Sequence, residues 1–466
     1  MSGIEYLGAG ELARRYRDRS LSPVEVTRAL LDRIGGLDPV LGAFVHVAAV
    51  RALDDARHSE AAIAAGRPRG PLEGVPVALK DLLDASDMPT AAGSRVIGRL
   101  PARDAAVVAR LRAAGAVLLG KVGLHELAFG VTGVNPHFPP CRNPWDRERV
   151  PGGSSSGSAV ALAAGLAPLA IGTDTGGSIR IPSSACGVVG LKPTFGAVGR
   201  SGLVPLAWSL DHVGPMARSV ADAALLFDAI AGHDRDDPWS AAHAHEPAGR
   251  TLGAGVRGLR LGVLDASAAG AAAGVDDEVG AAVEAALGVL IGLGARTVPV
   301  AVPPLEPIYT ATFALIASEA GGYHRRRLAD RPSDFGEDVR RNLAIGLCLP
   351  AADVVAARRA QGVATGALLR SFDDVDAVVL PTLPRTALRR DDPVSREPRE
   401  AWNRLVVPFN LAGLPALSLP AGFDRAGLPI GLQVAGRPFD EATVLRVAAA
   451  YEGATDWHTR RPPLQA

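Results

Sequence analysis

The chain alternates segments of helical periodicity with short apolar segments along most of its length, and this alternation most restricts its fold. Apolar runs bounded by turn residues are typical of buried strands. We expect strands at 75–80, 116–122, 259–265, 376–381, 415–420 and 429–436, and helices at 22–37, 48–66, 104–115 and 439–452, with a helix then a strand within 276–300. The pattern predicts a three-layer α/β/α fold with a large mixed, mostly parallel central sheet.

Composition indicates a globular chain with no electrostatic preference for anionic partners. Of 466 residues, 48% are hydrophobic and 21% are charged, so a large core can form. The 49 Lys and Arg balance the 49 Asp and Glu. Because the net charge is zero, we expect neither nucleic acid nor an anionic membrane surface as a partner. We find no internal repeat and expect a single domain over 1–466.

The cysteines and apolar runs favour a cytoplasmic location. Cys141, Cys186 and Cys348 form no CxxC pair, which argues against a disulfide framework or a thiolate metal site. The first twenty residues lack the apolar centre of a signal peptide. The apolar run at 158–172 is too short to span a membrane.

Several local motifs are better explained without a catalytic role. GAVLLGK (115–121) has the spacing of a phosphate-binding loop, but Val122 stands where Ser or Thr would bind magnesium. GSSSG (153–157) matches a nucleophile elbow at its central serine, but the charged, proline-bearing segment before it is no core strand. We interpret His243 and His245 as parts of a solvated loop, 324–331 as an exposed helix face, and 235–255 and 384–400 as surface connections.

Three polar elements form a more convincing set: Lys80, the serines that begin at Ser154, and Ser178. Ser154 lies 74 residues after Lys80, and Ser178 a further 24 residues on. A serine needs a base to become a nucleophile, and lysine can be that base only when burial keeps it neutral. Lys80 follows the apolar run VPVAL, so its amine is expected at the buried end of a strand. A second serine can relay the proton, because a hydroxyl both donates and accepts.

The stretch GTDTGGSIRIP (172–182) can supply the remaining part of such a site. Gly176 and Gly177 permit backbone conformations closed to other residues, so the N–H groups of Thr175 to Ser178 can converge on an oxyanion. Taken separately, each element also has an ordinary explanation: a surface lysine, a helix-capping turn and a tight glycine turn.

The wider sequence around these residues resembles the amidase signature family. The resemblance is carried by PGGSSSGSAVALAAGLAPLAIGTDTGGSIRIPSSACGVVGLKPTFGAVGRSGLVPLAWSLDHVGP (151–215), and by GVPVALKD (74–81), NLAGLPALSLPAGF (410–423) and LPIGLQVAGRPFDE (428–441). It covers most of the chain from about residue 20 onward. It implies an amidase domain with a signature core at about 70–235 and a variable substrate-side region at about 300–372.

The resemblance implies a Ser–cis-Ser–Lys triad without a metal or organic cofactor. Ser178 matches the acylated nucleophile, Ser154 the bridging serine after a cis peptide bond, and Lys80 the base. The backbone of Thr175, Gly176 and Gly177 matches the oxyanion hole, and the supporting positions are Ser155, Asp174 and Arg180.

The chain departs from many relatives at three places. Ala185 replaces a bulky aromatic residue, Leu82 replaces Asn, and Pro139–Pro140–Cys141 replaces a glycine-containing turn. We expect these differences to alter the lining of the substrate pocket and to leave the chemistry intact.

The resemblance leads us to expect an amidohydrolase with a small-molecule amide substrate, and it leaves a homodimer open. The first alternative is the glutamine-hydrolysing subunit of a tRNA-dependent amidotransferase, with Tyr309, Glu319, Tyr323 and Arg325 as candidate glutamine contacts. The second alternative is a non-catalytic binding protein on an amidase scaffold.

Overall fold

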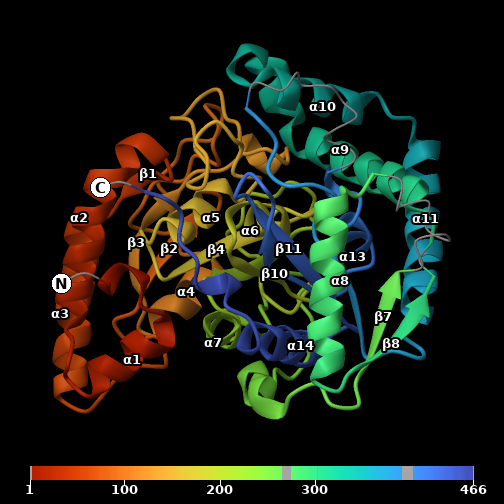
Figure 1. Cartoon of the computed structure of the whole chain (residues 1–466). Coiled ribbons are helices and arrows are strands. Elements are labelled where there is room, and N and C mark those ends of the chain that lie inside the picture. The colour runs from red at the N-terminus through yellow and green to blue at the C-terminus, as the bar shows by residue number, and fades with distance from the viewer. Residues whose placement is uncertain (1–2, 265–273, 302, 391–401, 465–466) are drawn as a thin grey trace.

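The computed structural model describes residues 3–264, 274–301, 303–390 and 402–464. Its strands are β1 Phe44–Val47, β2 Pro76–Lys80, β3 Val117–Val122, β4 Leu169–Asp174, β5 Val189–Lys192, β6 His212–Ala217, β7 Arg260–Leu264, β8 Arg296–Val300, β9 Ala377–Pro381, β10 Ala416–Phe423 and β11 Pro429–Ala435. Within these residues they form one 11-stranded sheet in the order β1-β3-β2-β4-β6-β5-β10-β11-β9-β7-β8 (Figure 1).

Helices cover both faces of this sheet. They are α1 Ala9–Arg17, α2 Pro23–Leu41, α3 Ala49–Ala64, α4 Ala106–Ala113, α5 Ser156–Ala163, α6 Arg180–Cys186, α7 Val220–Ile230, α8 Asp277–Gly292, α9 Leu305–Asp330, α10 Glu337–Cys348, α11 Ala351–Arg370, α13 Val407–Leu411 and α14 Glu441–Gly453. Helices α5 and α6 pack on one face, and α7, α8 and α14 on the other. The predicted three-layer α/β/α arrangement is therefore confirmed.

The sheet is mixed, but it is not mostly parallel as the sequence led us to expect. Of its ten neighbouring strand pairs in the described chain, β2–β3, β2–β4, β7–β8 and β7–β9 are parallel and the other six are antiparallel. A parallel pair needs a long crossover, whereas antiparallel strands can follow one another through a short turn. The hairpin from β10 to β11, which turns at 424–428, is such a case.

Most of the predicted elements are present, with one instructive error at the first long helix. Ser22 caps α2 by accepting N–H bonds from Val24 and Glu25, as its sequence suggests. We expected the helix to end at the glycine pair near residue 36, yet it continues to Leu41. It ends where Gly42 adopts a left-handed conformation (φ 63°), and two glycines inside a helix weaken it without breaking it.

Helices α9, α10 and α11 form a separate group beside the sheet core (Figure 1). Their apolar faces enclose a second hydrophobic cluster, which includes Leu315, Leu343 and Ala364. The basic run at 324–331 lies at the end of α9, where Arg325 and Arg326 are exposed as predicted but His324 is buried.

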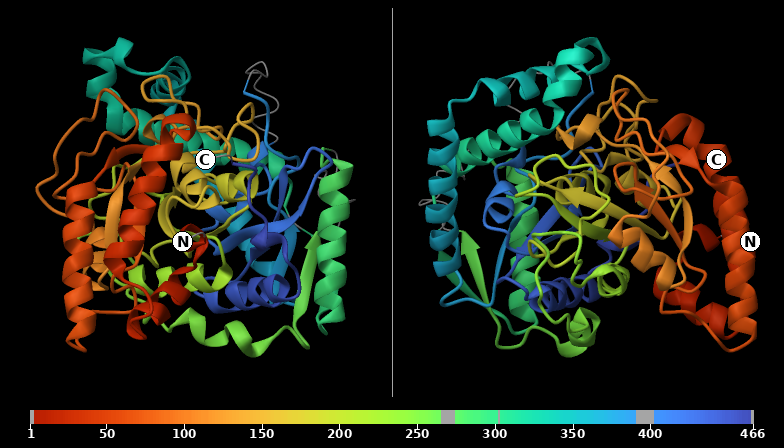
Figure 2. Two further views of the ribbon diagram at one scale, coloured as in Figure 1. Left: turned by 60° about the vertical axis from the view of Figure 1, so that its left-hand side comes forward. Right: turned by 180° about the vertical axis from the view of Figure 1, so that it is seen from behind.

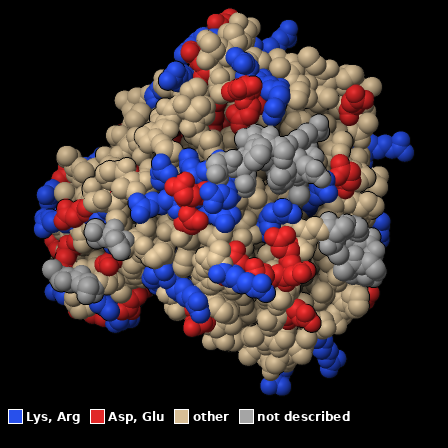
Figure 3. All heavy atoms as spheres, turned by 45° about the horizontal axis from the view of Figure 1, so that its top comes forward, with Lys and Arg blue, Asp and Glu red and all other residues tan. Residues whose placement is uncertain are grey.

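The two ends of the described chain lie close together, with the Arg461 guanidinium 4.6 Å from the centroid of the Tyr6 ring (Figure 2). Acidic and basic side chains are interspersed over the face in Figure 3. Among the described helices, none is both long enough and apolar enough to cross a membrane. The predicted surface connection at 384–400 falls outside the described residues from 391 onward.

Candidate active site

Lys80 is the last residue of β2, and its side chain is completely buried. Its Nζ lies 2.8 Å from Ser154 Oγ, 2.9 Å from Ser155 Oγ and 2.8 Å from Thr173 Oγ1. Because β2 lies beside β4 in parallel, the end of β2 is brought next to the end of the strand that carries Thr173. Three hydroxyl groups thus surround one buried amine.

Burial lowers the pKa of Lys80 to about 7, although the negative charges of Asp174 and Asp211 partly oppose this shift. Water is excluded from the amine, and no carboxylate hydrogen-bonds to it among the described residues. The charged form is therefore poorly stabilised, and the amine can be neutral near physiological pH.

The serine segment joins Lys80 to the nucleophile turn. The Gly153–Ser154 peptide bond is cis, and α5 begins two residues later. The Ser154 carbonyl accepts the His125 N–H at 3.1 Å, and the Ser155 N–H donates to the Ser178 carbonyl at 3.2 Å. These backbone bonds hold Ser154 beside Ser178.

The nucleophile turn is built around the Asp174 carboxylate at the end of β4. It accepts the N–H groups of Gly177 at 2.7 Å and Ile179 at 3.1 Å. Gly177 has φ 114°, and a Cβ at this position would collide with Val406. Only glycine both adopts this positive φ readily and has no Cβ to collide with Val406.

The same bonds determine which N–H groups of the turn remain available for a ligand. Because the Gly177 N–H is bound to Asp174, it is already satisfied. The N–H groups of Thr175, Gly176 and Ser178 have no acceptor among the described residues.

Arg180 neutralises the buried Asp174 and ties the turn to the C-terminal strands. Burial alone would raise the pKa of Asp174, but the charge and hydrogen bonds of Arg180 lower it below its ordinary range. The guanidinium also reaches Asn410 Oδ1 at 2.6 Å and Gln433 Oε1 at 2.7 Å. The network connects α6, α13 and β11 to the end of β4.

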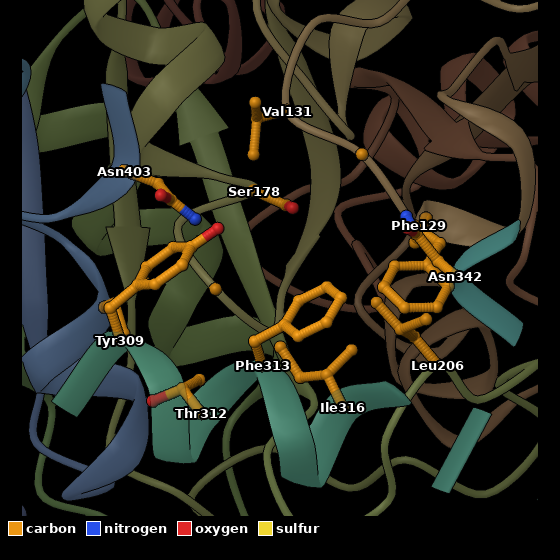
Figure 4. A pocket seen from close by; sticks show the side chains of 14 residues that line it. Phe129, Val131, Ser178, Leu206, Tyr309, Thr312, Phe313, Ile316, Asn342 and Asn403 are labelled. Carbon is orange, nitrogen blue, oxygen red and sulfur yellow. The ribbon is translucent and has the colours of Figure 1, made fainter. Parts of the chain in front are cut away.

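The Ser178 hydroxyl faces a cavity of about 130 Å³ between the signature core and α9 (Figure 4). Phe129 and Phe313 lie on one side, with ring centroids 6.4 Å apart, while Tyr309 and Asn403 lie together on another. The lining residues are Ala128, Phe129, Gly130, Val131, Gly176, Ser178, Leu206, Tyr309, Thr312, Phe313, Ile316, Asn342, Asn403 and Val407. None of these described residues carries a charge at neutral pH.

Comparison with known proteins identifies the family to which this site belongs. The family described as Amidase matches residues 25–445, which is most of the chain. The chain belongs to the amidase family. It is an enzyme family that acts on amide C–N bonds, and it is the amidase signature group that the sequence resembles.

Three relatives show how the amidase chain compares along its whole length. It is 42% identical to a glutamyl-tRNA(Gln) amidotransferase subunit of Symbiobacterium thermophilum, over 98% of this chain and 99% of the relative. A chain from a vestigial protein complex, solved in work on the origins of an s-triazine catabolic enzyme, superposes with a TM-score of 0.90 at 36% identity, covering 96% and 98% of the two chains. A bacterial aryl acylamidase also gives a TM-score of 0.90, at 26% identity and 98% coverage of each chain.

These names correct our expectation about partners. We expected no nucleic acid from the balanced charge of the chain, and a small-molecule amide substrate from the resemblance. The Symbiobacterium relative is named as one subunit of an enzyme of glutamyl-tRNA(Gln), so that expectation is wrong. Zero net charge excludes only a chain that is basic overall, and a subunit can also serve a nucleic acid that another chain holds.

The structure brings all the predicted signature residues of the amidase chain together. Of the four candidate glutamine contacts of the variable region, in contrast, only one lines the cavity. Tyr309 lines the cavity. Glu319 is buried and bonds to Ser209 and Arg358, whereas Tyr323 and Arg325 are exposed, and none of these three lines the cavity.

The three departures from the family pattern lie outside the lining of the cavity, although Leu82 packs in the same cluster as the lining residues Phe129 and Leu206. Ala185 packs in the cluster around Trp402, and Leu82 packs in the cluster beneath α9. Cys141 is a buried free thiol. None of the three lines the cavity, so the prediction that they alter its lining is wrong.

Sequence reasoning missed two polar residues at the site. Thr173 contacts Lys80, and Asp211 accepts the Thr175 hydroxyl at 2.6 Å. Thr173 lies within GTDTGGSIRIP (172–182), and its position five residues before Ser178 was the available signal. Asp211 lies within the stretch 151–215 that carries the resemblance, but no role was assigned to it there.

Proposed function

We propose that the chain hydrolyses a carboxylic amide through an acyl-enzyme on Ser178. The observation that carries this proposal is the 2.8 Å contact between Lys80 Nζ and Ser154 Oγ, in a buried site where the pKa of Lys80 is lowered to about 7. A neutral amine in contact with a serine hydroxyl can act as a general base.

The hydroxyl arrangement supports this direction of proton transfer. Ser155 Oγ donates its proton to the Thr173 carbonyl at 3.1 Å, so it must accept from Lys80. A neutral amine has two N–H bonds and one lone pair. If the second N–H goes to Thr173 Oγ1, the lone pair faces the Ser154 hydroxyl.

The reaction follows from that proton position. Ser154 passes its proton to Lys80 and takes one from Ser178, whose oxygen attacks the amide carbonyl carbon. The proton returns through Ser154 to the leaving nitrogen as the C–N bond breaks. A water molecule, deprotonated along the same path, then attacks the Ser178 ester and releases the acid.

The turn before Ser178 supports stabilisation of the tetrahedral intermediate. The N–H groups of Thr175, Gly176 and Ser178, which have no acceptor in the described part of the chain, are candidates for the oxyanion hole. Each donor of this kind lowers the barrier by about 3 kcal/mol in other enzymes. We assign Gly177 to the shape of the turn, because its N–H is bound to Asp174.

The relatives support a glutamine-hydrolysing subunit of a larger enzyme better than an amidase that works alone. The 42% identity to a glutamyl-tRNA(Gln) amidotransferase subunit supports glutamine as the amide, hydrolysed within a multisubunit enzyme that transfers the ammonia to a charged tRNA. In this setting the chain needs a partner protein. The three free cysteines are in keeping with a cytoplasmic location.

The cavity supports a second candidate, an amide whose acyl group is uncharged. Free glutamine carries an ammonium and a carboxylate, yet none of the described lining residues offers an opposite charge. Burying an unpaired charge is costly, whereas Phe129, Phe313 and Ile316 favour an apolar group.

One experiment tests the mechanism and separates the two substrates. Ammonia release is measured from L-glutamine and from hexanamide, with Ser178→Ala and Lys80→Ala as controls. A preference for glutamine that strengthens when partner subunits co-purify supports the amidotransferase setting, and a preference for hexanamide supports the uncharged acyl group. Equal activity of wild type and Ser178→Ala would show that the acyl-enzyme mechanism is wrong.

A further inference from the structure

The loop at 206–211 connects the oxyanion turn to the wall of the cavity. Thr175 Oγ1 donates to Asp211 Oδ1 at 2.6 Å, and Leu206 N–H donates to Asp211 Oδ2 at 3.0 Å. Thr175 belongs to the turn that leads to Ser178, while Leu206 lines the cavity. One buried carboxylate therefore fixes both parts.

The hydrogen bond between Thr175 and Asp211 is buried and is made to a charged acceptor. Both side chains are buried, at 1% and 2% exposure. Ala207 N–H also donates to the Asp211 carboxylate, at 3.1 Å and 3.2 Å to its two oxygens. A hydroxyl that donates to a carboxylate forms a stronger hydrogen bond than a neutral pair does.

The loop at 206–211 is bonded to Arg200 and Glu319, which lie outside it, so its own position is fixed. Arg200 donates to the Trp208 and Asp211 carbonyls at 2.6 Å and 3.1 Å, and pairs with Asp237. Glu319 on α9 accepts the Ser209 N–H at 3.0 Å. The loop is thereby anchored to both the core and the substrate-side helices.

We propose that Asp211 is a positioning residue for the reaction, which sets the Thr175 backbone so that the N–H groups of Thr175 and Gly176 meet the developing oxyanion. This inference rests on the proposed amide hydrolysis. It adds a role to a residue outside the triad and outside the glycine turn. The Thr175 hydroxyl is the connection through which Asp211 acts.

The alternative for this contact is a purely structural one, in which it contributes to folding only. The two roles differ in what they change. Positioning of an oxyanion donor acts on the transition state, so its loss lowers kcat and leaves KM almost unchanged. Loss of stability changes the amount of folded enzyme and the melting temperature, but not kcat per labelled active site.

The test compares Thr175→Val, Thr175→Ser, Asp211→Asn and the double variant Thr175→Val/Asp211→Asn on the amide that wild type hydrolyses best. Active sites are counted by labelling with a fluorophosphonate, and kcat and KM are measured separately. Thr251→Val serves as the matched control, since it removes a threonine hydroxyl that bonds to Ala248 and Ala442 far along the chain.

We expect Thr175→Val and Asp211→Asn each to lower kcat about 10- to 100-fold, somewhat less than removal of an oxyanion donor itself. KM should change less than about twofold, and Thr175→Ser should keep kcat within about threefold of wild type. The double variant should be no slower than the slower single variant, because both remove one interaction.

Three results would overturn the proposal: additive losses in the double variant, a Thr175→Ser enzyme as slow as Thr175→Val, or a changed KM at unchanged kcat. If Asp211→Asn does not fold, the comparison of Val with Ser at position 175 decides alone. Wild-type kcat in the Thr175 variants together with an inactive Ser178→Ala would reject this role and leave the amide hydrolysis standing. Full activity in Ser178→Ala would reject the amide hydrolysis mechanism itself.

Discussion

At the scale of single residues, the site depends on keeping one amine uncharged. Lys80 is enclosed by the hydroxyl groups of Ser154, Ser155 and Thr173, which hydrogen-bond to the amine without adding a negative charge. A carboxylate in the same position would hold the amine protonated. The choice of Ser and Thr neighbours therefore matters as much as burial does.

The pH dependence of activity follows from Lys80. Burial lowers its pKa to about 7, and the base must be neutral, so kcat/KM should rise about tenfold per pH unit below pH 7 and level off above it. Burial also raises the pKa of Glu452 to about 7, so this group titrates in the same range. The control is Glu452→Gln, which should keep the fall of kcat/KM below pH 7, the acidic limb of the pH profile. Loss of that limb in the control would contradict the assignment to Lys80.

The variant Thr173→Val tests whether Thr173 orients the amine of Lys80, because loss of folding alone would not change the pH at which kcat/KM falls. Without the Thr173 hydroxyl the ammonium loses one acceptor, so the pKa of Lys80 falls further and the acidic limb moves to lower pH. The plateau of kcat/KM should nevertheless drop about tenfold or more, because the lone pair is no longer directed at Ser154. A limb that moves to higher pH would be inconsistent with this arrangement.

At the scale of elements, sequence patterns predicted several buried strands but missed β5, β6 and the substrate-side helices. β2, β3 and β10 are fully or almost fully buried, and such strands give continuous apolar runs. No clear period marks α9, because it contacts α10, α11 and α13 and carries apolar residues around much of its circumference. None marks α11 either, because exposed Val355 and Val363 interrupt its polar face. Local patterns therefore did not predict α9, although the resemblance placed the substrate-side region at about 300–372, and the candidate Tyr309 lines the cavity from α9.

Helix α2 offers a test of the glycine pair that misled the prediction of its end. A Cβ at Gly36 would meet no atom within 4 Å, and the position is exposed. Gly36→Ala should raise the free energy of unfolding by about 0.5–1 kcal/mol, measured by thermal unfolding.

The matched control for α2 is Gly42→Ala. Gly42 has φ 63°, and a Cβ there would lie 2.7 Å from the Pro140 carbonyl oxygen. This variant should lower the melting temperature. Equal effects of the two substitutions would contradict the description of where the helix ends.

At the scale of the whole molecule, a buried ionic network joins segments more than 200 residues apart. Arg180 pairs with Asp174 and bonds to Asn410 and Gln433, which come from the opposite end of the chain. The resemblance marked Asp174 and Arg180 as supporting residues, but it gave no partner from the C-terminal region. Long-range contacts of this kind cannot be deduced from local spacing.

Breaking this network should destabilise the entire fold. Arg180→Met leaves the Asp174 carboxylate buried without its counter-charge, which costs about 3–5 kcal/mol in comparable cases. The measurement is urea unfolding, with Arg14→Ala as the control, because Arg14 forms only exposed pairs on α1. A loss no greater than that of the control would show that the network contributes little.

The cavity has one wall that cannot vary and one that can. Gly177 excludes every other residue by both its φ of 114° and the contact with Val406, so the nucleophile turn is closed to mutation. Tyr309 and Phe313 line the cavity from α9, which is a separate element from that turn. A lineage can therefore acquire new substrates by drift at these two positions, and a laboratory library confined to them would sample new specificities while Glu319, which anchors the 206–211 loop, stayed in place.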